Sequence, residues 1–221
     1  MDKNKLFLIY PPISKRERYS SDIGHAGGSQ IPLGIYYLAS YMRQNNFIVK
    51  AIDAETLKLD SAYIIQQIKD FEPAYVGISS TTVAFHRAFE LAKEIRRQCE
   101  DIVLLIGGPH VTANPVETIN TGLFNYGIIG EGEITLLQLL QSLNKNFLPK
   151  DIDGLVYLDN DNQPYSTQKR EFIKLLDELP FPAYDLIDDI SLYNPPPSNY
   201  KTLPVINIIT SRGCPFHCTF C

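Results

Sequence analysis

The sequence predicts a doubly wound, Rossmann-like α/β fold with a five-stranded parallel sheet in the flavodoxin-like order 2-1-3-4-5. Short apolar runs and amphipathic stretches alternate five times within residues 1–145. This is the rhythm of a parallel sheet with helices on both faces. The apolar runs are nearly continuous, as in strands buried on both faces. Glycine and hydroxyl residues follow three of the runs, at the edge where such sheets bind ligands.

Turn signals bound the predicted strands. The first strand, residues 6–10, ends at two consecutive prolines, and a glycine-containing loop of residues 13–30 follows it. Loops of this length inside compact domains are often functional. The remaining strands are expected at residues 47–52, 74–79, 102–106 and 126–129.

The stretches between the strands predict helices. Pro32 opens the first helix, whose apolar face consists of Ile35, Leu38, Ala39 and Met42 at helical spacing. Further helices are expected at residues 60–70, after Thr82, at residues 115–120 and from Glu133 onward. Thr82 or a neighbour is expected to cap its helix, because a hydroxyl can accept a hydrogen bond from an early N–H group.

The character of the chain changes after about residue 145. Residues 154–158 and the turn at residues 159–162 predict a small hairpin. A proline-punctuated linker then runs to residue 200, and residues 203–209 predict a last strand that leads into a cysteine-rich loop. The expected domains are therefore residues 1–145, a hairpin and linker at residues 146–200, and a strand with its loop at residues 201–221.

The cysteine-rich loop predicts a metal centre. Cys214, Cys218 and Cys221 are spaced Cys-x3-Cys-x2-Cys, and thiolates this close can all reach one centre. Iron–sulfur clusters are held by cysteine thiolates, and three ligands leave one iron open. The alternative is a zinc knuckle with His217 as the fourth ligand, although a histidine between closely spaced cysteines is unusual for zinc. A disulfide is disfavoured because nothing marks the chain as secreted.

With an aromatic residue before its last cysteine, the loop resembles the cluster loop of radical S-adenosylmethionine enzymes. The resemblance implies that Cys214, Cys218 and Cys221 hold a 4Fe–4S cluster whose open iron binds S-adenosylmethionine. It also implies that Phe220 lies near the adenine of S-adenosylmethionine. Arg212 is expected to shape the loop and to offset the charge of the cluster.

Composition narrows the function classes. The net charge of −5 argues against a nucleic-acid surface built on bulk positive charge. No apolar run approaches the length needed to span a membrane, and the short run near the N-terminus is not a signal-peptide core. A cytoplasmic location is expected, where thiols stay reduced. Cys99 stands alone and is expected to be a free thiol without a role.

Residues at three strand ends predict a ligand site on the first domain. Gly107-Gly108 would let a ligand approach the backbone, so that a valine at Gly108 should block binding without disturbing the fold. The arrangement resembles cobalamin-binding domains, in which such elements surround the nucleotide tail of the cofactor. The expected cobalamin contacts are Ser79, Ser80, Thr81, Gly107, Gly108, Pro109, His110, Gly130, Glu131 and Gly132. The alternative for the Gly-Gly-Pro stretch is an ordinary tight turn.

No histidine is expected on the cobalt. Cobalamin-binding domains often carry Asp-x-His-x-x-Gly after the first strand, with the histidine bound to cobalt. Here Asp22 and His25 lie in that region with the wrong spacing. His25, His86 and His110 are each expected to be surface residues.

The order of a cobalamin-type domain, a proline-punctuated linker and a cysteine-rich loop resembles that of cobalamin-dependent radical S-adenosylmethionine enzymes. The resemblance covers essentially the whole chain and implies that residues 201–221 begin a (β/α) barrel. It implies that a 5′-deoxyadenosyl radical takes hydrogen from an unactivated carbon of a small-molecule substrate, and that methylcobalamin delivers a methyl group to that carbon. The expected partners are that substrate and an electron donor such as a flavodoxin or ferredoxin.

Two alternatives remain open at this stage. The chain could be a cobalamin-binding carrier that hands its cofactor to a partner, or a zinc-stabilised interaction module. A (β/α) barrel takes roughly 200 residues, so the chain by itself is expected to be inactive and to be the front part of a longer enzyme.

Overall fold

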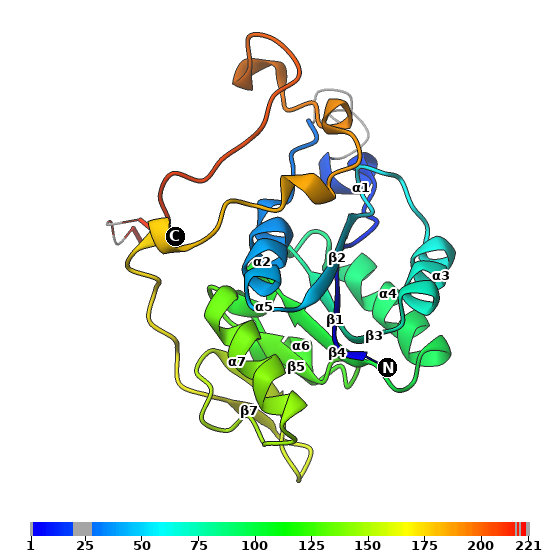
Figure 1. The fold of residues 1–221 in the computed structure, drawn as a ribbon, viewed down its shortest axis with the longest axis vertical. Helices are drawn as coiled ribbons and strands as arrows, with labels where there is room; N and C mark the ends of the chain where they lie inside the picture. The colour runs from blue at the N-terminus through cyan, green and yellow to red at the C-terminus, as the bar shows by residue number, and fades with distance from the viewer. Residues whose placement is uncertain (1, 20–27, 215, 217, 220–221) are drawn as a thin grey trace.

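The computed structural model describes residues 2–19, 28–214, 216, 218 and 219. Their centre is a seven-stranded sheet in the order β2-β1-β3-β4-β5-β6-β7 (Figure 1). The strands are β1 (Asp2–Tyr10), β2 (Ile48–Asp53), β3 (Pro73–Ser79), β4 (Val103–Gly107), β5 (Tyr126–Ile128), β6 (Leu155–Leu158) and β7 (Pro164–Ser166). The first five strands are parallel, which confirms the predicted fold class and the order 2-1-3-4-5.

The predicted hairpin forms, but it belongs to the sheet and increases the strand number from five to seven. β6 pairs antiparallel with β5, with Val156 opposite Gly127, and β7 pairs antiparallel with β6. β5 is only three residues long, and without the hairpin its outer edge would expose unpaired backbone groups. The sequence shows the hairpin but not the edge that it covers.

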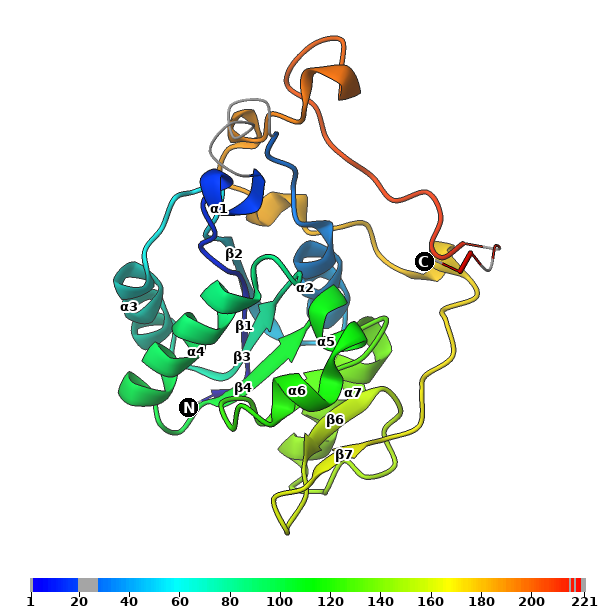
Figure 2. The same cartoon turned by 180° about the vertical axis from the view of Figure 1, so that it is seen from behind.

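Helices cover both faces of the sheet (Figures 1 and 2). On one face, α2 (Leu33–Gln44) and α7 (Glu133–Asn144) share a core with the strands. The second core lies on the opposite face, under α3 (Ser61–Phe71), α4 (Phe85–Gln98), α5 (Pro109–Ala113) and α6 (Pro115–Ile119). The short helix α1 (Lys15–Tyr19) follows β1 at the carboxyl edge of the sheet.

The N-terminus of α3 has a side-chain cap, and that of α4 does not. Asp60 caps α3, because its side chain accepts a hydrogen bond from the backbone N–H of Tyr63 at 2.8 Å. The prediction that Thr82 or a neighbour caps α4 is wrong. Ala84 occupies the cap position and no side chain bonds there, while the hydroxyl of Thr82 lies 3.3 Å from Nδ1 of His110.

The segment expected to be a linker packs against the first core. It contains four short 3-10 helices, Leu176–Glu178, Tyr184–Leu186, Ile190–Leu192 and Pro197–Asn199. The backbone N–H of Ala183 donates to the carbonyl of Tyr36 on α2 at 3.0 Å. Tyr193 is 3% exposed and belongs to the core that α2 shares with the sheet. This stretch is therefore a structural part of the α/β unit.

Tyr193 packs beside a buried polar pair, Asp53 at the end of β2 and Tyr36 on α2. The carboxylate of Asp53 accepts hydrogen bonds from the backbone N–H groups of Glu55 and Thr56, each at 3.1 Å. Burial raises the pKa of Asp53 against these hydrogen bonds. Burial also raises the pKa of Tyr36 to about 12, so its hydroxyl is protonated at neutral pH.

The strand predicted at residues 203–209 does not form in the described part of the chain. A strand exists only when a neighbouring backbone completes its hydrogen bonds, and no described strand lies beside these residues. Asn207 instead holds the segment. Its carbonyl accepts from the hydroxyl of Tyr184 at 2.8 Å, and its amide donates to the carbonyl of Ile31 at 3.0 Å.

Among the described residues, no helix combines the length and apolar character needed to cross a bilayer.

We expect Tyr193→Ala to destabilise the protein by about 3 kcal/mol, because it empties a buried aromatic site beside the buried carboxylate of Asp53. Urea unfolding followed by circular dichroism measures this loss. Leu192→Ala is the matched control, since Leu192 is 43% exposed and should change stability by no more than about 0.5 kcal/mol. Equal small effects of the two variants would show that the segment is a loose linker.

Candidate functional site at the carboxyl edge of the sheet

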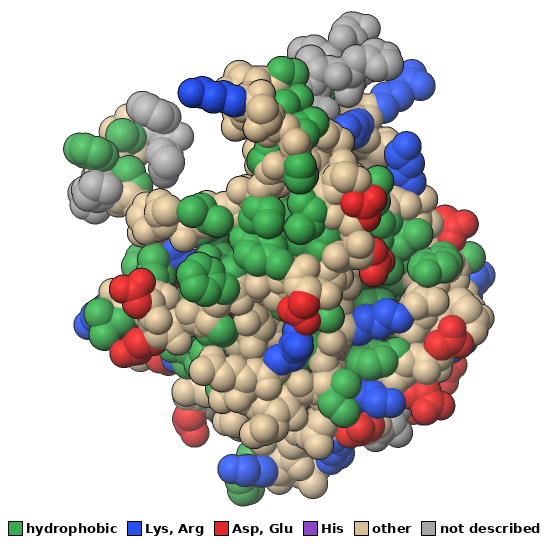
Figure 3. Space-filling view, turned by 45° about the horizontal axis from the view of Figure 1, so that its top comes forward, with side chains coloured by type: hydrophobic (Ala, Val, Ile, Leu, Met, Phe, Trp, Pro, Cys, Tyr) green, Lys and Arg blue, Asp and Glu red, His purple; other side chains and the backbone are tan. Residues whose placement is uncertain are grey.

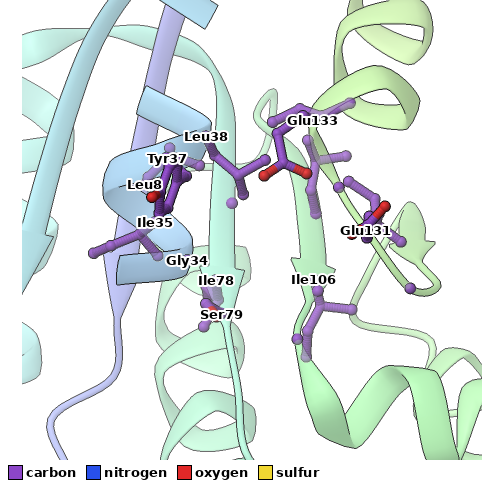
Figure 4. A pocket seen from close by; sticks show the side chains of 18 of the residues that line it. Leu8, Gly34, Ile35, Tyr37, Leu38, Ile78, Ser79, Ile106, Glu131 and Glu133 are labelled. Atoms are coloured by element: carbon purple, nitrogen blue, oxygen red, sulfur yellow. The ribbon is translucent and has the colours of Figure 1, made fainter. Parts of the chain in front are cut away.

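A cavity of about 320 Å³ lies at the carboxyl edge of the sheet, between α2 and α7 (Figure 4). On the face of the sheet that α2 and α7 cover, these helices follow β1 and β5. The helices that follow β3 and β4 lie on the opposite face, so the carboxyl ends of β3 and β4 have no helix over them on the first face. The lining residues are Leu8, Gly34, Ile35, Tyr37, Leu38, Gly77, Ile78, Ser79, Leu105, Ile106, Gly107, Gly108, Ile128, Gly130, Glu131, Gly132, Glu133, Leu136, Ile209 and Arg212. Largely apolar walls with a few polar groups are typical of small-molecule sites.

Gly107 leaves the floor of the cavity bare. It lies two residues after Leu105 on β4, so both face the side of the sheet covered by α2 and α7. A Cβ atom at Gly107 would find only Ile128 nearby, at 3.8 Å. A side chain here would therefore project into the cavity without a clash.

The wall of the cavity formed by α2 also contains a glycine that leaves space for a ligand. Gly34 and Leu38 are one helical turn apart, and both line the cavity (Figure 4). A Cβ atom at Gly34 would meet nothing within 4 Å. Leu38, predicted as a core residue, is only partly buried, because its outer side faces this space.

Gly108 has a different reason to be glycine from the predicted one. Its φ is +99°, and a Cβ atom there would lie 2.7 Å from the carbonyl oxygen and 2.9 Å from the nitrogen of Ser80. The end of β4 thus presses against the backbone that follows β3, where the N–H of His110 also donates to the carbonyl of Ser80 at 3.1 Å. The expectation that a valine at Gly108 leaves the fold intact is therefore wrong, because it would force these two strand ends apart.

His110 is buried, which corrects its prediction as a surface residue. It is 5% exposed, and its ring stacks on Phe85 with centroids 3.9 Å apart. Burial lowers its pKa, against the nearby charge of Glu117, so the ring is neutral at neutral pH. It does not line the cavity. His86 is exposed and bonds to Glu17, and His25 lies outside the described residues.

The segment that precedes the cysteines forms part of the cavity wall. Ile209 and Arg212 both line it. The guanidinium of Arg212 bonds to Glu133 at 2.6 Å and to Glu131 at 3.3 Å, and its carbon lies 5.3 Å from the ring centroid of Tyr37. Burial lowers the pKa of Arg212, but the hydrogen bonds and charges of Glu133 and Glu131 outweigh this and raise it.

This ion cluster is well shielded from water. The side chains of Arg212, Glu131 and Glu133 are 20%, 13% and 5% exposed. Removing one partner of a buried ion pair costs on the order of 3 kcal/mol, because a charge is left unpaired. Arg212 was expected to offset the charge of a cluster; in the structure its guanidinium pairs with two carboxylates.

The cysteines fall partly within the described chain. Cys214 and Cys218 are free and exposed, whereas Cys221 and Phe220 lie outside the described residues. Cys99 is half-buried at the end of α4, and burial raises the pKa of its thiol. A protonated thiol is a poor ligand and nucleophile.

The predicted contact residues divide into two groups. Ser79, Gly107, Gly108, Gly130, Glu131 and Gly132 line the cavity, whereas Ser80, Thr81, Pro109 and His110 do not. Ser80 is fully buried and bonds within the strand-end turns. Sequence reasoning missed Gly34, Tyr37 and Arg212. A glycine in the first turn of an otherwise apolar helix was the available signal for Gly34.

Comparisons with known proteins agree with this geometry. The B12 binding domain family matches residues 20–140, which is more than half of the chain. The chain is also 36% identical over 223 residues to an uncharacterized methyltransferase of Pyrococcus horikoshii, covering 98% of this chain and 45% of that protein. It is 26% identical to the cytidylyl-2-hydroxyethylphosphonate methyltransferase of Streptomyces wedmorensis, covering 86% of this chain and 43% of that protein. The chain thus spans less than half the length of these curated relatives.

Solved structures share the fold. The cobalamin-dependent S-adenosylmethionine radical enzyme OxsB, with aqua-cobalamin and S-adenosylmethionine bound, superposes with a TM-score of 0.70 at 21% identity, covering 83% of this chain and 24% of that one. The radical S-adenosylmethionine methyltransferase TsrM from Kitasatospora setae gives a TM-score of 0.62 at 17% identity, covering 76% of this chain and 30% of that one.

We expect Gly108→Val and Gly107→Val to separate folding from the cavity. Gly108→Val should cost about 3 kcal/mol or more, since it adds backbone strain and a clash with Ser80. Gly107→Val should stay within about 1 kcal/mol of the wild type, because a β-branched residue suits a strand and meets no close neighbour. Thermal and urea unfolding without ligand test this, and equal losses for both variants would contradict the assignment.

Proposed function

The chain belongs to the B12 binding domain family, and from this we propose that its cavity holds the nucleotide tail of cobalamin and that its cysteine loop holds a 4Fe–4S cluster, as in radical S-adenosylmethionine enzymes. The observation that carries the proposal is the cavity itself. It opens at the carboxyl edge of a doubly wound sheet, where such folds bind ligands, and one of its walls is the segment that leads to Cys214.

The residues present fit a cobalamin tail. The floor and the α2 wall are bare at Gly107 and Gly34, where a Cβ atom would meet no close neighbour. The walls are apolar, which suits an aromatic base, and Ser79 offers a hydroxyl at the end of β3. The volume of about 320 Å³ lies at the lower end of the range for small-molecule sites, in keeping with one part of a larger cofactor.

The space above the strand ends suits the rest of the cofactor. Figure 3, which turns the top of Figure 1 forward, shows hydrophobic side chains gathered over this side of the molecule. Exposed apolar residues at this end of the chain include Ile206, Ile208 and Ile209. Of the two described histidines, neither His86 nor His110 lines the cavity. The proposal that cobalt carries no histidine rests on the spacing of Asp22 and His25 in the sequence.

The cysteine loop is proposed to hold the cluster through Cys214, Cys218 and Cys221, with S-adenosylmethionine at the open iron and Phe220 near its adenine. When bound, the cluster would supply an electron for cleavage of S-adenosylmethionine, and methylcobalamin would supply a methyl group for transfer to an unactivated carbon. The part of this chain is to hold the cofactor tail, to keep water out of the apolar cavity, and to place the cysteines beside it. A small-molecule substrate and an electron donor such as a flavodoxin or ferredoxin complete the proposal.

A carrier that donates cobalamin to a partner is the second candidate. The same cavity supports it, since binding the cofactor does not require the cysteines. The two functions differ at the loop: an enzyme of this kind needs a redox-active cluster within reach of the cofactor, and a carrier does not.

We expect Gly34→Leu to weaken cobalamin binding by at least about tenfold, because its side chain would occupy the cavity without disturbing the helix. Titration of the protein with aquocobalamin, followed by absorbance, measures the affinity. Gly34→Ala is the matched control: it adds a single methyl group and should bind nearly as well as the wild type. Unchanged binding by Gly34→Leu, with the fold intact, would place the cofactor elsewhere.

We expect anaerobic reconstitution of the whole protein to load iron and sulfide on the cysteine loop. Replacing Cys214, Cys218 or Cys221 by alanine should remove the cluster, while Cys99→Ala should leave it intact, because three thiolates with an open iron suit a 4Fe–4S cluster. Iron and sulfide content and electron paramagnetic resonance of the reduced protein measure this. His217→Ala is the discriminating control: stoichiometric zinc that is lost in this variant would favour the zinc-stabilised interaction module instead.

A further inference from the structure

Arg212 joins three parts of the chain that are far apart in sequence. Its guanidinium bonds to Glu131 and Glu133 at the turn between β5 and α7, at 3.3 and 2.6 Å. It also lies over the ring of Tyr37 on α2, 5.3 Å from the centroid. Figure 4 shows Glu131 and Glu133 beside the cavity, opposite the side chains of α2.

The same carboxylates hold a further segment. The second oxygen of Glu131 accepts a hydrogen bond from the backbone N–H of Ile173 at 2.6 Å, in the stretch between β7 and the first 3-10 helix. Glu133 is the first residue of α7, where a negative charge is favoured by the helix dipole. Glu131 is therefore held by a bond of its own, and Glu133 is placed by its position at the start of α7.

Arg212 is the last described anchor before the cysteines. Among the described residues that follow Asn207, it alone forms hydrogen bonds to the rest of the described chain. It lies two residues before Cys214, and three residues after Ile209, which contacts the same cavity. The position of this segment therefore depends on the pairing of one guanidinium with two fixed carboxylates.

We propose that Arg212, Glu131 and Glu133 form a latch that couples occupation of the cavity to the position of the cysteine loop. The inference rests on the proposed function and goes beyond it, because it makes Arg212 a positioning residue for both cofactors. A ligand in the cavity would pack against Ile209 and Arg212 and stabilise the wall that they form. By linkage, the closed wall must then strengthen ligand binding by the same factor.

The charges make the latch specific for arginine. Without Arg212, two carboxylates with little exposure to water would lie close together without a counter-ion, and their repulsion would push the turn and the segment apart. A lysine would keep the charge but could not present the planar fork that reaches both acids at once. Lysine should therefore rescue the latch only in part.

The test uses the whole protein, with aquocobalamin as the probe and no measurement of turnover. Hydrogen exchange followed by mass spectrometry reports on residues 205–214 with and without cobalamin, and absorbance titration gives the affinity. In the wild type we expect cobalamin to slow exchange in this segment. In Arg212→Gln we expect that protection to be lost and the affinity to fall by about tenfold. The variant should also unfold at a lower temperature, because two shielded carboxylates lose their counter-ion, so both proteins are compared well below that temperature.

Two further variants sharpen the result. Arg212→Lys should give intermediate affinity and protection. Glu133→Gln should weaken both less than Arg212→Gln does, because it removes the closer carboxylate but leaves Arg212 paired with Glu131. Arg43→Gln is the matched control, since Arg43 pairs with Asp185 at 2.6 Å on the surface and away from the cavity. It should match the wild type in both measurements.

The outcomes separate this inference from the proposed function. Cobalamin binding by the wild type without any change of exchange in residues 205–214 would overturn the latch and leave the cofactor site standing. Affinity of Arg212→Gln within twofold of the wild type would also overturn it. A wild-type protein that fails to bind cobalamin would overturn the proposed function and the latch together.

Discussion

A parallel sheet must be covered on both faces, and in this protein part of one face has no helix over it. The connections after β2 and β3 place α3 and α4 on one face, and those after β1 and β5 place α2 and α7 on the other. The carboxyl ends of β3 and β4 therefore stay open between α2 and α7 (Figure 4). The cavity lies in the space that this arrangement leaves, with glycines along its lining and Ile209 and Arg212 forming its third wall.

The third wall comes from the far end of the chain. The segment after β7 returns along α2, where Tyr193 and Ala183 join the core, and it brings Ile209 and Arg212 to the mouth of the cavity. The stretch after the hairpin is therefore a packed part of the structure and not a flexible linker. It carries the cysteine loop to the same edge of the sheet as the cavity, so that both proposed cofactor sites share a boundary.

The glycines at this edge serve two different physical purposes, which the sequence alone does not separate. Gly108 is glycine because of its φ of +99° and because the backbone of Ser80 leaves no room for a Cβ atom. Gly107 and Gly34 have room for one, and their lack of a side chain keeps the cavity open. The adjacent glycines look equivalent in sequence, but one holds two strand ends together and the other faces a ligand site.

Much of the fold could be predicted from local patterns. Continuous apolar runs place the first five strands, and their alternation with amphipathic stretches gives the order 2-1-3-4-5, because parallel strands require crossover helices. The strand-end glycines point to one edge of the sheet, since that edge collects the carboxyl ends of all parallel strands. Six of the ten residues expected at the cofactor site do line the cavity.

Features that depend on contacts between residues far apart in the sequence could not be predicted. Residues 203–209 have the composition of a strand, but whether a strand forms depends on a neighbouring backbone. His110 looks like a surface turn residue until Phe85 stacks on it, and Arg212 has no visible partner until Glu131 and Glu133 are placed beside it. The sequence by itself determined the five parallel strands and their order, because these follow from periodicity and short-range spacing. The tertiary structure alone decided which side chains meet at the carboxyl edge of the sheet, because burial and ion pairing join residues far apart in the chain.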